Sequence, residues 1–532
     1  MAMAMSARRR PRPPLALLLL LLGLLPPARP LSGPETRRSS VLLDPASGQL
    51  RIVPGWDPAA VAWANLTDRI QDTGWSFLEL ATSEKYNDSL QAYAAGLAEA
   101  SVSEQLIYMH WMNTMVGYCG PFKYQTVYCE KLKSYIETNL AWMEEQMEKG
   151  DLEYWYQVRL ALLQLKGLED GYNGRVAFPT GRFSVAPFGF LLFQLGGDLE
   201  DLESALNRTE RKHTLGSGSC SALIKLLPGN QELLVSHDTW NTYQSMLRII
   251  KKYMLPFRTS AHSDDMISGH IQTFSSYPGT IFSGDDFYIL SSGLVTLETT
   301  IGNSNAALWK YIHPEGSVLE WLRNIVANRL ARSGAEWAAI FQQFNSGTGL
   351  VVVADKTEEL YQKGYWASYN VPYFEQIFNA SGQLELVKKY GDWFTYDKSP
   401  RAQIFRRNQT LVQDMDSMIQ LMRFNNFLKD PLSRCQGCDP PQNAENAIAA
   451  RSDLNPANGT YPFAALRQRS HGGTDMKITS YAMAKGYSLI AACGPTWDDV
   501  PPFQWSTSPY SNLLHMGHPD LWKFPPIKIW WD

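Results

Sequence analysis

Strand-like segments follow one another in hairpins through the middle of this chain, and helical segments precede and follow them. The clearest pair is "SALIKLL" and "ELLVSHDTW", residues 221–227 and 232–240, joined by the turn "PGN". Hairpins build antiparallel sheets, and each sheet needs a helical cover for its apolar face. The sequence therefore predicts an α+β fold, with a four-layer αββα sandwich as its natural packing. Periodicity alone does not separate this sandwich from a simpler α+β arrangement.

The helical segments are recognised by apolar spacing and by caps. Before the hairpins, we expect strands at 40–53 and 75–83 and long helices at 87–116, 125–150 and 154–174. After the first hairpin, we expect a helix at 242–254, strands at 270–279, 287–293 and 294–302, a helix or helix pair at 317–345, and strands at 349–355 and 364–374. From about Arg401 the chain is expected to be rich in loops.

The N-terminal stretch has the pattern of a secretory signal. Basic residues between Arg8 and Arg12 precede an apolar run from Leu15 to Leu25, which is too short to span a bilayer. The mature chain is expected to start near Ser32 to Ser40. No later segment is long and apolar enough for a transmembrane anchor. The net charge is −4 and no basic stripe follows the N-terminus, so nucleic acid is not an expected partner.

Glycosylation sequons agree with a secretory route. The chain carries six Asn-x-Ser/Thr motifs, and we expect them in exposed turns. They begin at Asn65, Asn87, Asn207, Asn379, Asn408 and Asn458.

The chain has six cysteines, and their spacing indicates in which compartment it folds. "YCGPFKYQTVYC" places Cys119 and Cys129 at the ends of a small loop, and "RCQGCDPP" places Cys435 and Cys438 in a tighter one. In an oxidising compartment, both pairs are typical of local disulfides. A redox motif or half of a zinc site is the alternative for the second pair, although its Pro-rich turn and the lack of further ligands disfavour both. Cys220 and Cys493 are left over.

Common catalytic motifs are absent. The sequence contains no G-x-S-x-G, H-E-x-x-H, P-loop or G-x-G-x-x-G. The nearest approach, "GNSNA" at residues 302–306, is typical of a helix N-terminal turn. No metal or other cofactor is expected.

Cys220 stands at the start of a strand, directly after the flexible run "GSGS" at residues 216–219. A free thiol has a pKa near 8.5 and needs a base to become a nucleophile. If the Ser219–Cys220 bond were cut, the new α-amine, with an ordinary pKa of about 7.7–8.0, would supply that base. A buried thiol and a Cys220–Cys493 disulfide are the alternatives that local sequence leaves open.

Longer motifs resemble the phospholipase B-like proteins. The similarity lies in "GSCSALIKLLPG", "ELLVSHDTWNTYQSMLRIIKKY", "SSYPGTIFSGDDFYILSSGLVTLETT", "ARSDLNPANGTYPF" and "GPTWDDVPPFQWSTSPYSNLLHMGHPDLWKF", and it covers the chain from about residue 40 onward. That family belongs to the N-terminal nucleophile hydrolases, which share the αββα sandwich and free their nucleophile by self-cleavage. The resemblance implies scission before Cys220 into two chains that stay associated. It also implies a lysosomal address through mannose 6-phosphate glycans, and it strengthens both local disulfides.

This resemblance divides the chain at its one convincing linker. We expect a signal peptide and mature N-terminal edge at 1–38 and a mainly helical N-terminal chain at 39–206. A removable linker follows at 207–219, and the C-terminal chain at 220–532 completes the same domain.

The resemblance also implies a set of site residues. Cys220 matches the nucleophile, and His237 and Trp240 match pocket positions; a structural, hydrogen-bonded histidine is the alternative for His237. The other members are Thr300 (or Thr299, in an alternative register), Asn370 as an oxyanion donor and Arg401 as an anchor for an anionic group.

The function that follows is a lysosomal acyl hydrolase that deacylates phospholipids through a thioester. An amidase acting on small linear amides and a non-catalytic lipid-binding protein on a hydrolase scaffold are the alternatives. A homodimer is an additional expectation about assembly.

Overall fold

Two large sheets lie face to face in the computed structural model, which describes residues 35–119, 126–149, 152–179, 181–209, 220–347 and 350–531. Within these ranges the first sheet has the strand order β10-β9-β8-β7-β4-β3-β1-β2 and the second β11-β5-β6-β13-β14-β17, with β12 paired to β6. Residues Thr36–Asp532 make one compact unit. The signal segment and the Ser219–Cys220 bond fall outside the described residues.

The strands of the first sheet come from both sides of the linker. They are β1 (Glu35–Leu43), β2 (Leu50–Pro54), β3 (Ala62–Arg69), β4 (Trp75–Thr82), β7 (Arg248–Met254), β8 (Ile271–Ser276), β9 (Phe287–Leu290) and β10 (Val295–Leu297). β4 runs parallel to β7, from Trp75 opposite Arg248 to Ala81 opposite Met254. This pairing joins the segments before and after the linker at the centre of one sheet.

The second sheet is built only from residues after the linker. Its strands are β5 (Cys220–Leu226), β6 (Leu233–Thr242), β11 (Tyr365–Ser368), β12 (His471–Gly473), β13 (Asp475–Ser480), β14 (Leu489–Cys493) and β17 (Ile527–Ile529). β15 (Phe503–Gln504) and β16 (Leu521–Trp522) form a separate small ribbon.

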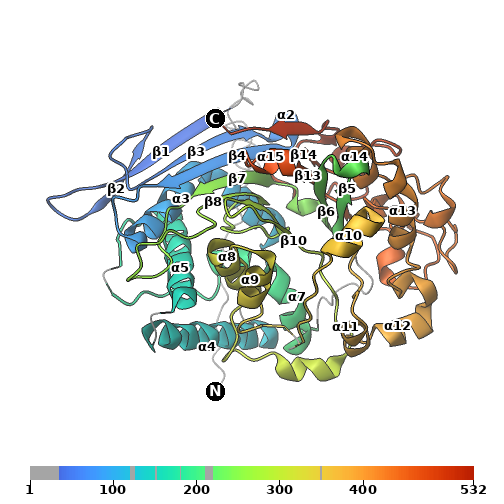
Figure 1. Cartoon of the computed structure of the whole chain (residues 1–532), viewed down its shortest axis with the longest axis horizontal. Helices are drawn as coiled ribbons and strands as arrows, with labels where there is room; N and C mark the ends of the chain where they lie inside the picture. Colours follow the sequence, from blue (N-terminus) through green and yellow to red (C-terminus); the bar gives the residue numbers. More distant parts are fainter. Residues whose placement is uncertain are drawn as a thin grey trace, which may run out of the picture. The chain divides into compact units, whose positions relative to one another are not determined.

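Helices cover the outer face of each sheet (Figure 1). The helices of the described ranges are α2 (Ile70–Thr73), α3 (Asp88–Thr114), α4 (Val127–Lys149), α5 (Glu153–Tyr172), α6 (Phe190–Gln194), α7 (Gly196–Ala205), α8 (Glu320–Leu330), α9 (Gly334–Phe341), α10 (Thr357–Lys363), α11 (Glu375–Ala380), α12 (Gln383–Tyr390), α13 (Pro400–Asn408), α14 (Met415–Met422) and α15 (Tyr481–Ala484). None of the helices in the described ranges combines the length and the apolar run needed to cross a bilayer.

Three apolar layers confirm the αββα sandwich. Leu97 and Leu160 of α3 and α5 pack on Leu78 and Ile249 of the first sheet. The layer between the sheets joins Trp75, Ile250 and Phe287 to Leu489 and Ala491. On the far side, α13 and α14 cover the second sheet through Phe405, Met418 and Met422, which pack on Leu223 and Ile478. Each sheet therefore buries both faces.

The first helical layer depends on two glycines. A Cβ added at Gly96 of α3 would lie 2.1 Å from the carbonyl oxygen of Gln164, and one added at Gly167 of α5 would lie 2.0 Å from that of Tyr93. Only residues without a side chain allow this close approach. Asn87 begins α3 as expected, because its side chain accepts a hydrogen bond of 2.9 Å from the backbone of Leu90.

Three expectations are corrected. Residues 242–254 are not a helix but a short turn followed by the central strand β7. Their cations, which suggest a polar helix face, are buried: Lys251 Nζ lies 2.6 Å from Glu99 Oε1 of α3. Residues 350–355 form no strand. The loop-rich tail nevertheless supplies β13, β14 and β17 to the second sheet.

Candidate functional site

Cys220 is the first residue of β5 and faces the space between the two sheets. It lies opposite Thr239 of β6, while Ala222 lies opposite His237, so these four residues share one face. Lys477 of β13 pairs with His237 on the same face. The Cys220 residue is only 4% exposed, and its thiol is free. The alternative Cys220–Cys493 disulfide is therefore wrong.

Two predicted residues hold the backbone of Cys220. Asn370 lies just beyond β11, whose Ser368 pairs with Ala222 of β5, so the antiparallel register carries Asn370 to Cys220. The Cys220 amide donates to Asn370 Oδ1 at 3.3 Å. Arg401, in the first turn of α13, donates to the Cys220 carbonyl oxygen and, at 2.9 Å, to the same Asn370 Oδ1. The amide nitrogen that cleavage would turn into an α-amine thus already faces an acceptor.

Asn370 adopts a backbone conformation that favours this role. Its φ is +65°, in the left-handed region that asparagine tolerates better than most residues. Its Nδ2 donates to the carbonyl oxygen of Thr300 at 2.8 Å. The Asn370 side chain therefore donates to Thr300 and accepts from Cys220. Asn370 and Arg401, which together hold the backbone of Cys220 at the start of β5, are called the clamp below.

Trp240 lies on the opposite face of the sheet from the thiol. Its indole N–H and the Ser221 hydroxyl both donate to the carbonyl oxygen of Ile448, at 3.1 and 2.9 Å. The Arg401 guanidinium lies 4.3 Å from the centre of the Trp240 ring. Trp240 therefore stacks on the Arg401 guanidinium and does not face the Cys220 sulfur.

His237 is buried and forms a hydrogen bond to the loop that contains Glu298. Its Nε2 lies 2.9 Å from the carbonyl oxygen of Glu298, which can only accept, so Nε2 carries the proton. Burial, reinforced by Lys477, lowers the pKa of His237 well below its ordinary value. The ring is therefore neutral and is a weak base near neutral pH. This geometry favours the structural alternative for His237.

The two threonines after Glu298 lie in the same loop. Thr300 Oγ1 donates to Glu298 Oε1 at 3.0 Å, and Thr299 Oγ1 bonds to Ser368 at the end of β11. Thr299 therefore fixes the loop to the second sheet, while Thr300 presents its carbonyl oxygen to Asn370.

A buried ion network next to Cys220 escaped the sequence analysis. Lys477 Nζ donates to Thr239 Oγ1 and to Asp475 Oδ1, both at 2.7 Å. Arg248 of β7 bonds to Asp475 at 2.7 Å and to Asp285. Although burial would raise the pKa of Asp285, Arg248 and Lys477 hold it at about 2. The alternation in "DMKITS", with Asp475 and Lys477 between apolar residues, was the available signal for a strand with one polar face.

The Cys220 thiol is protonated in this setting. Burial raises the pKa of Cys220 well above its ordinary value, Glu298 adds to the rise, and Lys477 opposes it. A proton acceptor in direct contact is needed to produce the thiolate.

A cleft opens beside these residues, and Thr300, Asn370 and Arg401 contribute to its lining. The buried Cys220 contacts Asn370 and Arg401 directly. The structure therefore brings the predicted residues together around the start of β5, with His237 and Trp240 on opposite faces of the neighbouring strand. Within the described ranges, no three His, Cys, Asp or Glu side chains gather in a way that would hold a metal ion.

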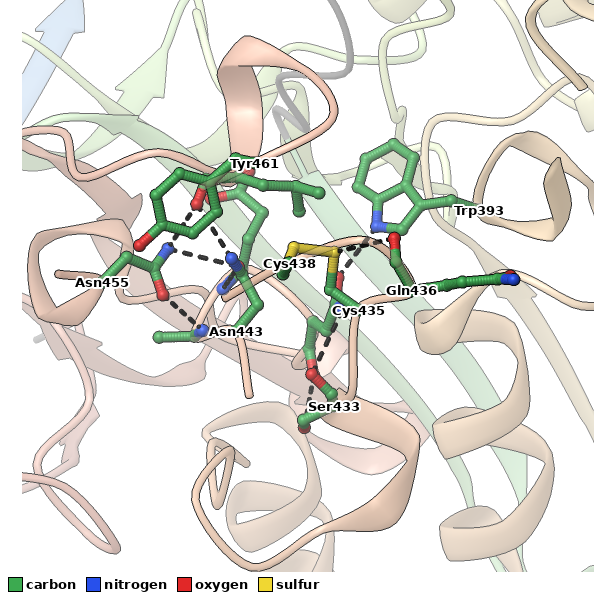
Figure 2. The surroundings of a disulfide bond; sticks show 12 residues. Trp393, Ser433, Cys435, Gln436, Cys438, Asn443, Asn455 and Tyr461 are labelled. Atoms are coloured by element: carbon green, nitrogen blue, oxygen red, sulfur yellow. Dashed lines mark hydrogen bonds between the residues drawn. A yellow bond between two sulfur atoms is a disulfide. The ribbon is translucent and has the colours of Figure 1, made fainter. Parts of the chain in front are cut away.

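Both local disulfides are confirmed. Cys119 bonds to Cys129, and Cys435 bonds to Cys438 near Trp393 and Asn443 (Figure 2). Because both sulfurs are used in this bond, the zinc alternative for the second pair is wrong.

The sequon asparagines occupy varied positions. Asn207 and Asn458 lie in exposed turns, as expected, and Asn87 and Asn379 are exposed at or within helices. The expectation of exposed turns is wrong for Asn65, which is half-buried in β3, and for Asn408, half-buried at the end of α13.

Comparison with known proteins identifies relatives over nearly the whole chain. The family model described as Phospholipase B matches residues 62–351 and 348–529. "Putative phospholipase B-like 2" of Homo sapiens is 66% identical over 94% of this chain and 90% of its own length. The protein of that name from Bos taurus is 61% identical, over 96% and 94%. "Putative phospholipase B-like 1" of Caenorhabditis elegans is 42% identical, over 88% and 87%. The motifs quoted above had suggested phospholipase B-like 1 within that group, whereas these mammalian relatives carry the name phospholipase B-like 2.

Proposed function

The chain belongs to the phospholipase B family, and from that premise we propose that it is a lysosomal acyl hydrolase that cleaves itself before Cys220 and deacylates phospholipids. The observation that carries this proposal is the clamp on Cys220, whose amide and carbonyl are held by Asn370 and Arg401 at the edge of a cleft.

The base in this proposal is the new terminal amine. The pKa of the buried Cys220 thiol is raised, so the thiol needs a proton acceptor in order to react. The pKa of His237 is lowered, so this ring is a weak acceptor. An α-amine lies within the same residue as the sulfur, and its pKa is near 7.7–8.0 in water. Burial of this terminus would lower that pKa, which the amine needs in order to accept a proton at pH 5. Asn370 Oδ1 orients that amine, because it already accepts from the same nitrogen.

The reaction then proceeds by two acyl transfers. The thiol proton passes to the α-amine as Cys220 Sγ bonds to the ester carbonyl carbon, and the C–O bond of the leaving alcohol breaks as the amine returns the proton to it. A water molecule attacks the resulting thioester and gives a proton to the amine. The C–S bond then breaks as the amine returns that proton to the sulfur, which releases the fatty acid and the free thiol. Amide substrates follow the same steps, with an amine as leaving group.

The fold supports association of the two product chains. β4 precedes the linker and β7 follows it, and the two strands pair over seven residues each in the first sheet, from Trp75–Arg248 to Ala81–Met254. Apolar contacts between α3 and both β7 and β8 add to this pairing. Cleavage at 219–220 therefore leaves a shared core intact.

The experiment compares wild type with Cys220→Ala, both secreted from cells. Wild type should give two fragments on reducing SDS gels, and N-terminal sequencing should show that the C-terminal fragment begins at Cys220. It should also release fatty acid from phospholipid vesicles at pH 5. Cys220→Ala should remain uncut and inactive. Cutting of both proteins would indicate an external protease, and an uncut but active wild type would contradict the mechanism. Release from an N-acyl amide, with none from phospholipid, would select the amidase alternative.

A further inference from the structure

We propose that Asp286 and Glu298 form a carboxyl pair that positions Cys220, and that the pair does so while it holds one shared proton. This inference rests on the proposed function, because it takes Cys220 and the clamp as the place of acyl transfer. Neither carboxyl is proposed to react with the substrate. Both act on the nucleophile through other side chains, so they are positioning residues.

The β9–β10 hairpin places the two carboxyl groups opposite each other. Leu297 of β10 pairs with Phe287 of β9, so the next pair along the ladder is Glu298 and Asp286. The Glu298 amide donates to the Asp286 carbonyl oxygen at 3.2 Å, and a hydrogen bond joins the two side chains. Directly opposite side chains share one face of an antiparallel pair, and like charges there repel. Two carboxyl groups bond to each other only when one of them carries a proton.

The proton lies on Asp286, the buried member of the pair. Asp286 is 8% exposed, whereas Glu298 is exposed. Burial raises the pKa of Asp286 well above its ordinary value, and the carboxyls of Glu320 and Glu298 add to the rise. Asp286 Oδ1 accepts from Asn324 Nδ2 at 2.7 Å. One oxygen of Asp286 therefore accepts from an amide, and the protonated carboxyl donates to Glu298.

Acids dominate the charged surroundings of the pair. The titratable groups that act on it or contact it are Cys220 of β5, His237 of β6, Glu200 of α7, Glu320 of α8, Asp285 before β9 and Tyr288 within β9. The cations of this region, Arg248 and Lys477, pair with Asp285 and Asp475. Loss of the Asp286 proton would therefore place two negative charges on one face of the hairpin, where they repel.

A chain of hydrogen bonds leads from this pair to the nitrogen of Cys220. Thr300 Oγ1 donates to Glu298 Oε1 at 3.0 Å, and the Thr300 carbonyl oxygen accepts from Asn370 Nδ2 at 2.8 Å. Asn370 Oδ1 in turn accepts from the Cys220 nitrogen at 3.3 Å. The position of the Glu298 carboxyl therefore helps to set the orientation of the amide that holds the nucleophile.

The loop after β10 also brings the pair to the second sheet. The Glu298 carbonyl oxygen lies 2.9 Å from His237 Nε2 of β6, and Thr299 Oγ1 bonds to Ser368 Oγ of β11 at 2.5 Å. The carboxyl pair belongs to the first sheet, and its loop thus reaches the second sheet beside Cys220.

The shared proton has two effects in the same direction. It supplies the hydrogen bond that fixes Glu298, and it removes one negative charge near the Cys220 thiol, whose pKa is raised by burial and further by Glu298. A carboxyl with a raised pKa keeps its proton at low pH and releases it to solvent as pH rises through that pKa. Activity should therefore decline on the alkaline side of its optimum as the pair loses its proton.

The first test is the pH dependence of kcat/KM from pH 4.5 to pH 9, with dihexanoyl phosphatidylcholine as the probe. Wild type should fall from its maximum by at least about tenfold at pH 9. Asp286→Asn and Glu298→Gln each replace one carboxyl with an amide, which donates to the remaining carboxylate at any pH. Each variant should fall from its own maximum by less than about threefold, because no shared proton is lost.

The matched control is Glu315→Gln, at an exposed turn position before α8, which should keep the wild-type alkaline decline. An identical decline in wild type and in both amide variants, or no decline of wild type up to pH 9, would overturn the proposal. Should one amide variant fail to fold, the other decides the outcome, since either amide removes the need for the proton.

Alkylation of Cys220 tests the pair without a substrate. Iodoacetamide labelling of the secreted proteins, followed by mass spectrometry, should accelerate between pH 7 and pH 9. The acceleration should be at least about threefold smaller in wild type than in Asp286→Asn, because ionised Asp286 adds negative charge near the wild-type thiol. Equal acceleration in the two proteins would contradict the effect of the pair on Cys220.

The two measurements separate this proposal from the proposed function. Different alkylation profiles without hydrolysis at any pH would contradict the hydrolase and support the pair. Hydrolysis with the same alkaline decline and the same alkylation profile in wild type and Asp286→Asn would contradict the pair alone.

Discussion

Cys220 and Cys493 have nearly the same burial but very different surroundings. Each is at the end of a strand, 3–4% exposed, and burial raises the pKa of both thiols. Cys493 packs among apolar residues between the sheets. A Cβ added at Gly74 would lie only 2.6 Å from the Cβ of Cys493. Cys220 instead has its backbone clamped by Asn370 and Arg401 next to a cleft. Burial and thiol pKa thus do not distinguish a nucleophile from a packing residue; the chain position and the backbone partners do.

The buried carboxyl groups between the sheets differ from those near α7 in their charge partners. Asp475 and Asp285, which lie near both cysteines, are paired with Arg248 and Lys477. Near α7, the pKa values of Asp201 and Glu320 rise to about 7 and about 8, mainly through burial. Arg248 and Lys477 therefore keep the pKa of Asp285 low, whereas burial keeps the pKa values of Asp201 and Glu320 high.

The largest expected effect is on thiol reactivity. In the matured protein, iodoacetamide should alkylate Cys220 at least about 100-fold faster than Cys493, because only Cys220 has an α-amine to take its proton. Mass spectrometry of tryptic peptides over time measures both rates. In uncut Cys220→Ser protein, Cys493 should stay unmodified until the chain unfolds. Faster labelling of Cys493 would reverse the assignment.

Loss of the ion network should come next. Lys477→Met leaves Asp475 with one cation fewer at a fully buried site, and we expect a loss of about 3–5 kcal/mol in the free energy of unfolding. Urea unfolding measures it. The matched control Lys485→Met removes an exposed lysine directly after α15, near the exposed Tyr481, and should change stability by less than about 0.5 kcal/mol. Similar losses in both variants would show that the network contributes little.

Removal of the clamp should affect activity more than folding. Asn370→Leu removes the acceptor for the Cys220 nitrogen and the donor to Thr300, and we expect kcat/KM to fall by about 100-fold. Asn512→Leu, at an exposed position, is the control. Unchanged kcat/KM in matured Asn370→Leu would exclude a role in orienting the amine.

The smallest effect concerns pH. A carboxyl whose pKa is raised in the folded state binds its proton more tightly there than in the unfolded chain, so its contribution to stability is present at low pH and is lost as pH rises toward the folded value. From the raised values of Asp201 and Glu320, Tm should fall by several degrees between pH 5 and pH 8.

Glu320→Gln should flatten this dependence, and Glu375→Gln, at an exposed site on α11, should not. Scanning calorimetry at both pH values measures it. A Tm that rises from pH 5 to pH 8 would contradict the assignment.

Local patterns predicted much of this fold correctly. The three long helices before the linker and the β5–β6 hairpin lie where spacing and caps placed them. The error at 242–254 has a physical cause: Arg248, Lys251 and Lys252 resemble a solvated helix face, but Arg248 and Lys251 pair with acids inside the sandwich. The spacing of charged residues along the chain does not show whether an oppositely charged partner lies within the core.

The sequence by itself determined the two disulfide loops, the αββα class, the family and the position of Cys220 directly after a Gly/Ser run. These depend on residues close together in the chain or on long motifs. Only the tertiary structure decided which face of β6 each side chain takes, that Asn370 and Arg401 reach Cys220, and that Lys477 and Asp475 stand beside it. Those contacts join residues more than 100 positions apart, and they form only when β11, β13 and α13 assemble around β5 and β6.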